Sequence, residues 1–155
     1  MTRTRSQIGK ASRTKGARFE VAVANAIRPW FPDVRRSRDN GSAATSDTGD
    51  LAGTHDGLWW SLKDVAAAHT EPPGLIRAWL DEATEKAGSR IPLVVVKRAG
   101  HADPLTSWCW LRLYDLLALA DDAQTCFVFP VRMELHQVLD LLTAAGYTTN
   151  PEENC

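Results

Sequence analysis

Apolar side chains in the first third of the chain follow a helical period. Phe19, Val23 and Ile27 recur every four residues, which places them on one face of an α-helix. This spacing predicts a helix from Lys15 to Arg28. Residues 1–13 are polar and basic without an apolar period, and we expect them to form a flexible arm.

Beyond this helix, short apolar runs alternate with turn residues, a pattern typical of strands and helices in one mixed sheet. The predicted elements are an edge strand at 33–39, a loop at 40–48, two strands around a turn at 56–57, a helix at 75–88, strands at 91–97 and 107–113, a short helix at 114–120, a strand at 126–131 and a helix at 133–145. The pattern predicts an α/β fold whose sheet is flanked by helices, as a single domain over 14–150 with a tail at 151–155.

The segment "GDLAGTHDGLWWSLKD", residues 49–64, contains a strong hairpin signal at Asp56-Gly57. A two-residue turn there places Asp50 directly opposite Lys63. Because side chains alternate between faces, Asp50, Ser61 and Lys63 should then project from one side of the sheet. The opposite side, expected to be the packed one, would carry Leu51, Trp60 and Leu62.

Charge is distributed unevenly along the 155 residues. Residues 1–38 hold ten Lys or Arg and two acids, a balance of +8, and the remainder has a balance of −9. Such segregation favours contact with a polyanion, most often nucleic acid, although a solubilising arm has the same composition. The candidate DNA-binding residues are Arg13, Lys15, Arg18, Arg35, Arg36 and Arg38.

Other classes of site and location find little support in the composition. The three cysteines are far apart and the four histidines are isolated, so neither a disulfide framework nor a zinc site is indicated. No apolar run is long enough for a membrane span, and the basic start lacks the apolar core of a signal peptide. We therefore expect a cytoplasmic protein without a membrane partner.

Three motifs in order resemble the PD-(D/E)xK nuclease superfamily. They are "GARFEVAVANAI" with Glu20 on the first helix, "SDTGDLAG" with Asp50, and "WWSLK" with Lys63. The predicted element order also resembles the restriction-endonuclease-like core, αβββαβ. The likeness covers residues 15–98 and is greatest to small phage-type proteins similar to Holliday junction resolvases.

This resemblance implies a metal-dependent DNA endonuclease that hydrolyses phosphodiester bonds, with Mg²⁺ or Mn²⁺ as cofactor and branched DNA as substrate. Asp50 would be the principal metal ligand and Glu20 an accessory acid. Lys63 would orient the attacking water or stabilise charge on the phosphate. For a phage-encoded member, the location would be the host cytoplasm.

Ser61 departs from the family pattern, because it stands where the motif "E-x-K" has a carboxylate. Three interpretations remain open. Another acid, namely Asp47, Asp64 or Glu82, replaces the missing one; or a water held by Ser61 fills the metal position; or the protein binds DNA without cutting it.

Two functions compete with the enzyme at this stage. One is a non-catalytic DNA-binding or regulatory protein on a degenerate nuclease scaffold, and the other is a protein-interaction module. The apolar segments at 107–113 and 126–129 suit the sheet core or a homodimer interface. Trp59 shares the face of Lys63, which allows either core packing or stacking on a base.

Overall fold

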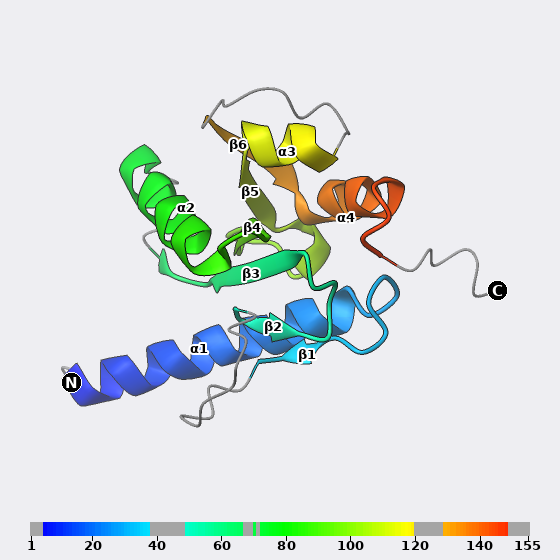
Figure 1. Cartoon of the computed structure of the whole chain (residues 1–155). Helices are drawn as coiled ribbons and strands as arrows, with labels where there is room; N and C mark the ends of the chain where they lie inside the picture. The colour runs from blue at the N-terminus through cyan, green and yellow to red at the C-terminus, as the bar shows by residue number, and fades with distance from the viewer. Residues whose placement is uncertain (1–4, 38–48, 67–69, 71, 120–128, 149–155) are drawn as a thin grey trace.

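The structure, a computed structural model, describes residues 5–37, 49–66, 70, 72–119 and 129–148, with side chains from residue 14 onward. Its elements are α1 (Arg5–Ala26), β1 (Arg35–Arg36), β2 (Leu51–Ala52), β3 (Leu58–Lys63), α2 (Pro73–Ala87), β4 (Ile91–Val96), the short 3₁₀ helix η2 (Pro104–Thr106), β5 (Trp108–Arg112), α3 (Leu113–Leu119), β6 (Pro130–Glu134) and α4 (Leu135–Ala144) (Figure 1). The mixed α/β class expected from the sequence is confirmed.

The main sheet contains four strands in the order β3-β4-β5-β6. β3 and β4 run parallel and are joined through α2, whereas the β4–β5 and β5–β6 pairs are antiparallel. β4 is a run of apolar and β-branched residues, and it lies between two neighbours with residues 92–96 buried. The composition of this strand therefore predicts its central position.

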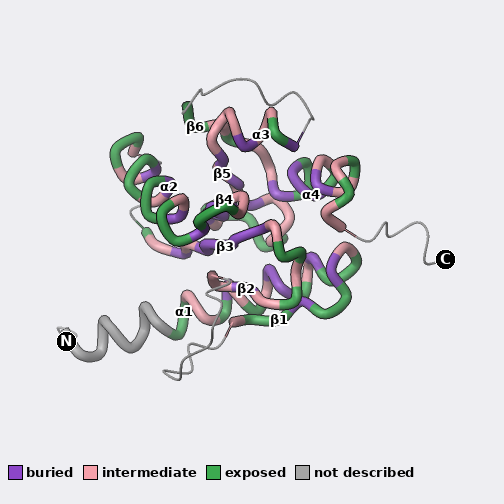
Figure 2. The backbone as a smooth tube through the Cα atoms, in the orientation of Figure 1, coloured by how far each residue is buried: buried purple, intermediate pink, exposed green. Residues whose placement is uncertain are grey.

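Helices cover both faces of this sheet (Figure 1). Leu58, Trp60 and Leu62 of β3 pack in one apolar cluster with residues of α1 and α4. Trp59 faces the other way and packs with α2, in the cluster that also holds Val94 and Val96. Figure 2 shows buried residues along β3 and on the sides of α2 and α4 that face the sheet. Strand alternation thus assigns each side chain of β3 to its face.

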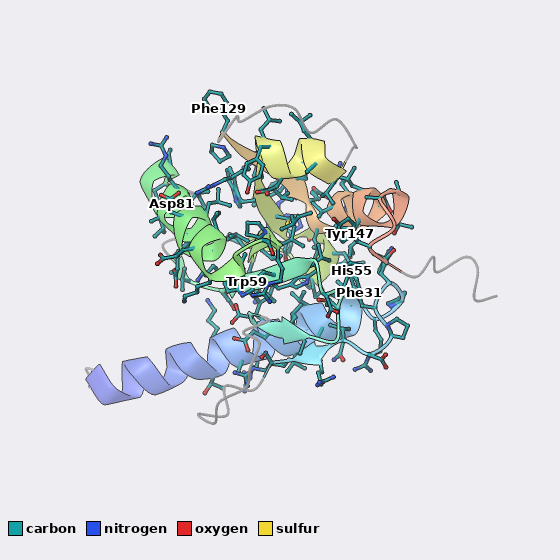
Figure 3. The ribbon with its side chains drawn as sticks, in the orientation of Figure 1. Phe31, His55, Trp59, Asp81, Phe129 and Tyr147 are labelled. Atoms are coloured by element: carbon teal, nitrogen blue, oxygen red, sulfur yellow. The ribbon has the colours of Figure 1, made fainter. Side chains whose placement is uncertain are left out.

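The prediction of which side chains share a face of the sheet is confirmed in part. Leu51, Trp60 and Leu62 do share one cluster, as the alternation requires. The opposite side is also packed, because α2 covers it. Trp59 is only 5% exposed there, so it packs in the core and does not present its ring for stacking (Figure 3).

The predicted two-residue hairpin is wrong. β2 pairs with β1, through Arg35↔Ala52 and Arg36↔Leu51, and the chain meets β3 only at the parallel bridge between Gly49 and Trp60. The predicted two-residue turn at Asp56-Gly57 does form, because the His55 carbonyl accepts from the Leu58 N–H at 3.0 Å, but the segments on its two sides do not pair as a hairpin. Asp50 therefore lies beside Trp60 and not opposite Lys63.

The boundaries of two other elements also differ from the predicted ones. α1 begins at Arg5 and not at Lys15, because residues that precede a helix already fixed by packing can extend it, each adding one backbone hydrogen bond. The last strand, β6, begins at Pro130, whereas a strand at 126–131 was expected. Residues 120–128 lie outside the described part of the chain.

Candidate active site

Both the backbone and the side chain of Asp50 bind the outer edge of β3, the edge that does not pair with β4. Its N–H donates to the Trp60 carbonyl at 2.8 Å, and its own carbonyl accepts from the Ser37 N–H at 2.9 Å. Its carboxylate Oδ2 accepts from the Leu62 N–H at 2.6 Å. These three bonds tie Asp50 to both β3 and the end of β1, so the position of the carboxylate is set by the backbone.

Two of the other predicted catalytic residues, Glu20 and Lys63, act on the charge state of Asp50. Burial raises the pKa of the Asp50 carboxyl above its ordinary value, and the negative charge of Glu20 raises it further. The hydrogen bond from Leu62 and the positive charges of Lys63 and Lys86 act in the opposite direction. A desolvated carboxylate that is coupled to a second acid and to a lysine is typical of functional sites, although structural ion pairs also produce it.

Glu20 reaches this edge of β3 from α1. Its side chain is 17% exposed and pairs with the guanidinium of Arg36 on β1. The ion pair satisfies a carboxylate that borders the apolar stripe of α1. Glu20 is therefore close enough to Asp50 to influence its pKa while its charge is balanced by Arg36.

Lys63 and two charged residues of α2 form the other side of the site. The Lys63 ammonium lies 5.6 Å from the ring centre of Trp79 on α2. Glu82 accepts a hydrogen bond from Lys86 at 2.7 Å, one helical turn away. This bond and the charge of Lys63 lower the pKa of Glu82. Glu82 therefore stays ionised within range of Lys63.

The structure separates the three candidates for the missing acid. Ser61 is 5% exposed and supplies no charge. Asp64 is also buried, but its carboxylate pairs with Lys15 at 3.0 Å and with Lys97 at 3.3 Å. Asp47 lies outside the described residues. Glu82 lies within electrostatic range of Lys63, whose positive charge lowers its pKa.

The Asp64 ion pairs give a first prediction about stability. Asp64→Asn keeps the size of the side chain but removes the charge that two lysines share, and it should lower the free energy of unfolding by about 1–2 kcal/mol. The expected loss is small because Lys15 and Lys97 are 49% and 40% exposed, so water can hydrate their charges when Asp64 is neutral. Urea unfolding at neutral pH measures the change, with the exposed Asp140→Asn as the control. Equal stability of the two variants would contradict a stabilising role for Asp64.

The predicted DNA-binding residues lie on α1 and β1. Lys15, Arg18, Arg35 and Arg36 are exposed. Arg36 and Lys15 are engaged by Glu20 and Asp64, respectively. The backbone of Arg13 belongs to α1, whereas Arg38 lies outside the described residues.

Sequence reasoning missed two participants, Lys86 and Arg36 in its role as partner of Glu20. The spacing of Glu82 and Lys86 at i and i+4 predicts their helical ion pair. It gives no indication that Lys86 lies within range of Asp50, because that depends on how α2 is oriented over β3.

The donor set meets only part of what a metal ion needs. Among the residues that the structure describes, no group of three His, Cys, Asp or Glu side chains is arranged to hold a metal. Mg²⁺ retains several waters and is often bound by one or two carboxylates together with substrate phosphates. Asp50 and Glu20 could supply two such carboxylates, since a cation between them would relieve their mutual repulsion.

Comparisons with protein-family models, with curated proteins and with solved structures give no match for this chain. Within the described ranges, no helix has both the length and the apolar character needed to cross a membrane.

Proposed function

We propose that the protein is a metal-dependent DNA endonuclease with a restriction-endonuclease-like fold, most similar to Holliday junction resolvases. The supporting observation is the electrostatic coupling of Asp50 to Glu20 and to Lys63 at one edge of β3. The element order α1-β1-β2-β3-α2-β4 also agrees with the order αβββαβ. The charges of Glu20 and Lys63, which the motifs single out, therefore both act on the Asp50 carboxyl.

Each residue has a distinct part in the proposed reaction. Asp50 and Glu20 would hold Mg²⁺ or Mn²⁺, with Ser61 contributing through a water, and the ion would supply an activated water and neutralise phosphate charge. The Lys63 ammonium stabilises the negative charge that develops on the phosphate. Glu82 takes the place of the acid absent at Ser61, since its ionised carboxylate lies within electrostatic range of Lys63.

The proposed activity is tested with labelled four-way junction, linear duplex and single-stranded DNA, each incubated with Mg²⁺ or Mn²⁺. We expect cleavage of the junction, and its loss in Lys63→Ala. Asp64→Asn serves as a matched control, because Asp64 follows Lys63 directly but is engaged by Lys15 and Lys97. No cutting of any substrate with either metal would refute the enzyme.

A second candidate, a non-catalytic DNA-binding protein on the same scaffold, is favoured by the neutral Ser61 and by the Glu20–Arg36 ion pair. Under this alternative, DNA is bound through the basic residues of α1 and β1, and Arg36 keeps Glu20 from binding a metal.

Ser61→Glu separates the two candidates. It restores the acid of the motif, and under the first proposal it should strengthen Mn²⁺ binding about tenfold, measured by calorimetric titration. The same change places a carboxylate at a position that is 5% exposed, so a loss of about 1–3 kcal/mol in stability is expected without metal. Unchanged Mn²⁺ affinity in a folded variant would support the non-catalytic protein.

A further inference from the structure

An arginine–tryptophan ladder, formed by Arg98, Trp108, Trp110 and Arg132, lies on the sheet face that α2 only partly covers. α2 packs on β3 and β4 and reaches β5. Trp108 and Trp110 on β5 are half-buried, and Arg132 on β6 is exposed. None of the four residues belongs to the candidate active site.

The ladder is held together by contacts between guanidinium groups and indole rings. The guanidinium carbons of Arg98 and Arg132 lie 4.3 Å and 4.2 Å from the ring centre of Trp108, and that of Arg132 lies 5.8 Å from Trp110. Arg98 also donates a hydrogen bond to Glu134 at 2.9 Å. At these distances the arginines are ordered by the rings, which reduces the entropy lost when a ligand binds.

The same face continues into an open hollow of about 370 Å³ between α2 and the start of β6. Arg77, Asp81, Arg112 and Phe129 line it together with Leu80 and Pro130. Phe129 is 63% exposed and projects beyond the start of β6, with Asp81 below it on α2 (Figure 3). A third aromatic ring and two more arginines thus lie next to the ladder.

We infer that the ladder and this hollow bind a single-stranded segment of nucleic acid. Among the described residues of this surface, four arginines face two acids, Asp81 and Glu134, so their charge is complementary to a polyanion. Nucleobases stack on aromatic rings and on guanidinium planes, while phosphates accept hydrogen bonds from guanidinium N–H groups. One surface with both chemistries fits the two repeating parts of a nucleic-acid strand.

The flat stacking groups favour unpaired bases over a duplex. In a duplex the face of each base is covered by its neighbours, whereas single-stranded bases expose theirs. An acidic peptide would also satisfy the charge, and the choice of nucleic acid over a peptide rests on the proposed function. For a nuclease that acts on branched DNA, such a surface would hold an unpaired region beside the cutting site.

The sheet register relates the ladder to the candidate active site. Lys63 pairs with Val96, Val96 with Trp108, and Trp108 with Glu134, so these four residues form one row across the sheet. From β3 to β5 this row spans two strand spacings, about 10 Å. A strand bound on the ladder would therefore pass within a few nucleotides of Lys63.

Fluorescence anisotropy with the full chain tests the inference, using a labelled oligothymidine of about 15 nucleotides and a duplex of equal length. Both are measured in EDTA, so that no cleavage contributes. The decisive variant is Arg98→Lys with Arg132→Lys, which keeps both positive charges but removes both planar guanidinium groups. We expect it to bind the single strand at least about tenfold more weakly and the duplex within about twofold of wild type.

The matched control is Arg28→Gln, which removes one exposed charge at a distance from the ladder and should change single-strand affinity by less than about twofold. Melting curves establish that each variant is folded. Unchanged single-strand affinity in the double variant, or an equal loss on the duplex, would overturn the inference. A shift from dimer to monomer with unchanged affinity would also overturn it and make the ladder a self-association surface. Failure of cleavage by the wild type, in contrast, refutes only the proposed function.

Discussion

Asp50→Asn should abolish DNA cleavage and at the same time stabilise the fold. Under the proposed function, the amide removes the charge on which metal binding depends, and loss of a central catalytic group costs at least about a thousandfold in rate. The stabilisation follows from burial and the repulsion by Glu20, both of which disfavour the ionised carboxylate. The amide oxygen can still accept from Leu62, so we expect a gain of about 1 kcal/mol at neutral pH.

The stabilisation should depend on pH in a defined direction. Because the pKa of Asp50 is raised in the folded protein, the folded state takes up this proton at a higher pH than the unfolded chain does. The wild type therefore loses stability relative to Asp50→Asn as pH rises through the folded pKa. The stability advantage of Asp50→Asn over the wild type should reach its full size above the folded pKa. It should vanish at pH values below the ordinary pKa of 3.8. Urea unfolding of both proteins across this range measures it.

Asp140→Asn is the matched control for Asp50→Asn, because it is the same substitution at an exposed position on α4. It should retain cleavage and change stability by less than about 0.5 kcal/mol. Asp50→Asn that cuts DNA at the wild-type rate would refute the assigned role of Asp50. A variant less stable than wild type at neutral pH would refute the account of its electrostatics.

The parts of the fold that sequence could predict are those with a clear period. The alternation in "LWWSLK" assigned Trp60 and Leu62 to one face of β3, and the helical stripe with Ile76 and Leu80 predicted the buried side of α2. Local patterns succeed here because the side-chain period follows directly from backbone geometry.

The parts that failed depend on contacts between distant segments. The turn at Asp56-Gly57 predicted a hairpin, but β2 pairs with β1, and the bridge to β3 is formed by Gly49, which precedes β2. The pairing of Glu20 with Arg36 likewise depends on how β1 lies against α1. The charge of Lys63 acts on the pKa of Asp50 even though the register that first related the two residues was wrong.

Gly49→Ala should be far more destabilising than the half-buried position of Gly49 suggests. Gly49 has φ +76°, and a Cβ added there would lie 2.1 Å from the Trp60 carbonyl oxygen. The left-handed backbone alone costs an alanine about 1–2 kcal/mol, and relieving the contact requires the chain to move away from β3. We expect a total loss of about 3–4 kcal/mol. The displacement would also break the bond from the Asp50 N–H to the Trp60 carbonyl, so the glycine before the aspartate is needed to dock the carboxylate on β3.

Gly100→Ala separates the two causes, since Gly100 has φ +77° and no heavy atom within 4 Å of an added Cβ. It carries the backbone strain without the collision, so urea unfolding should show a loss of only about 1–2 kcal/mol. Gly49→Ala should lose about 2 kcal/mol more than Gly100→Ala. This additional loss measures how closely the backbone at residue 49 approaches Trp60. Equal losses in the two variants would mean that residue 49 is not held against Trp60, and the placement of Asp50 beside Leu62 would fail with it.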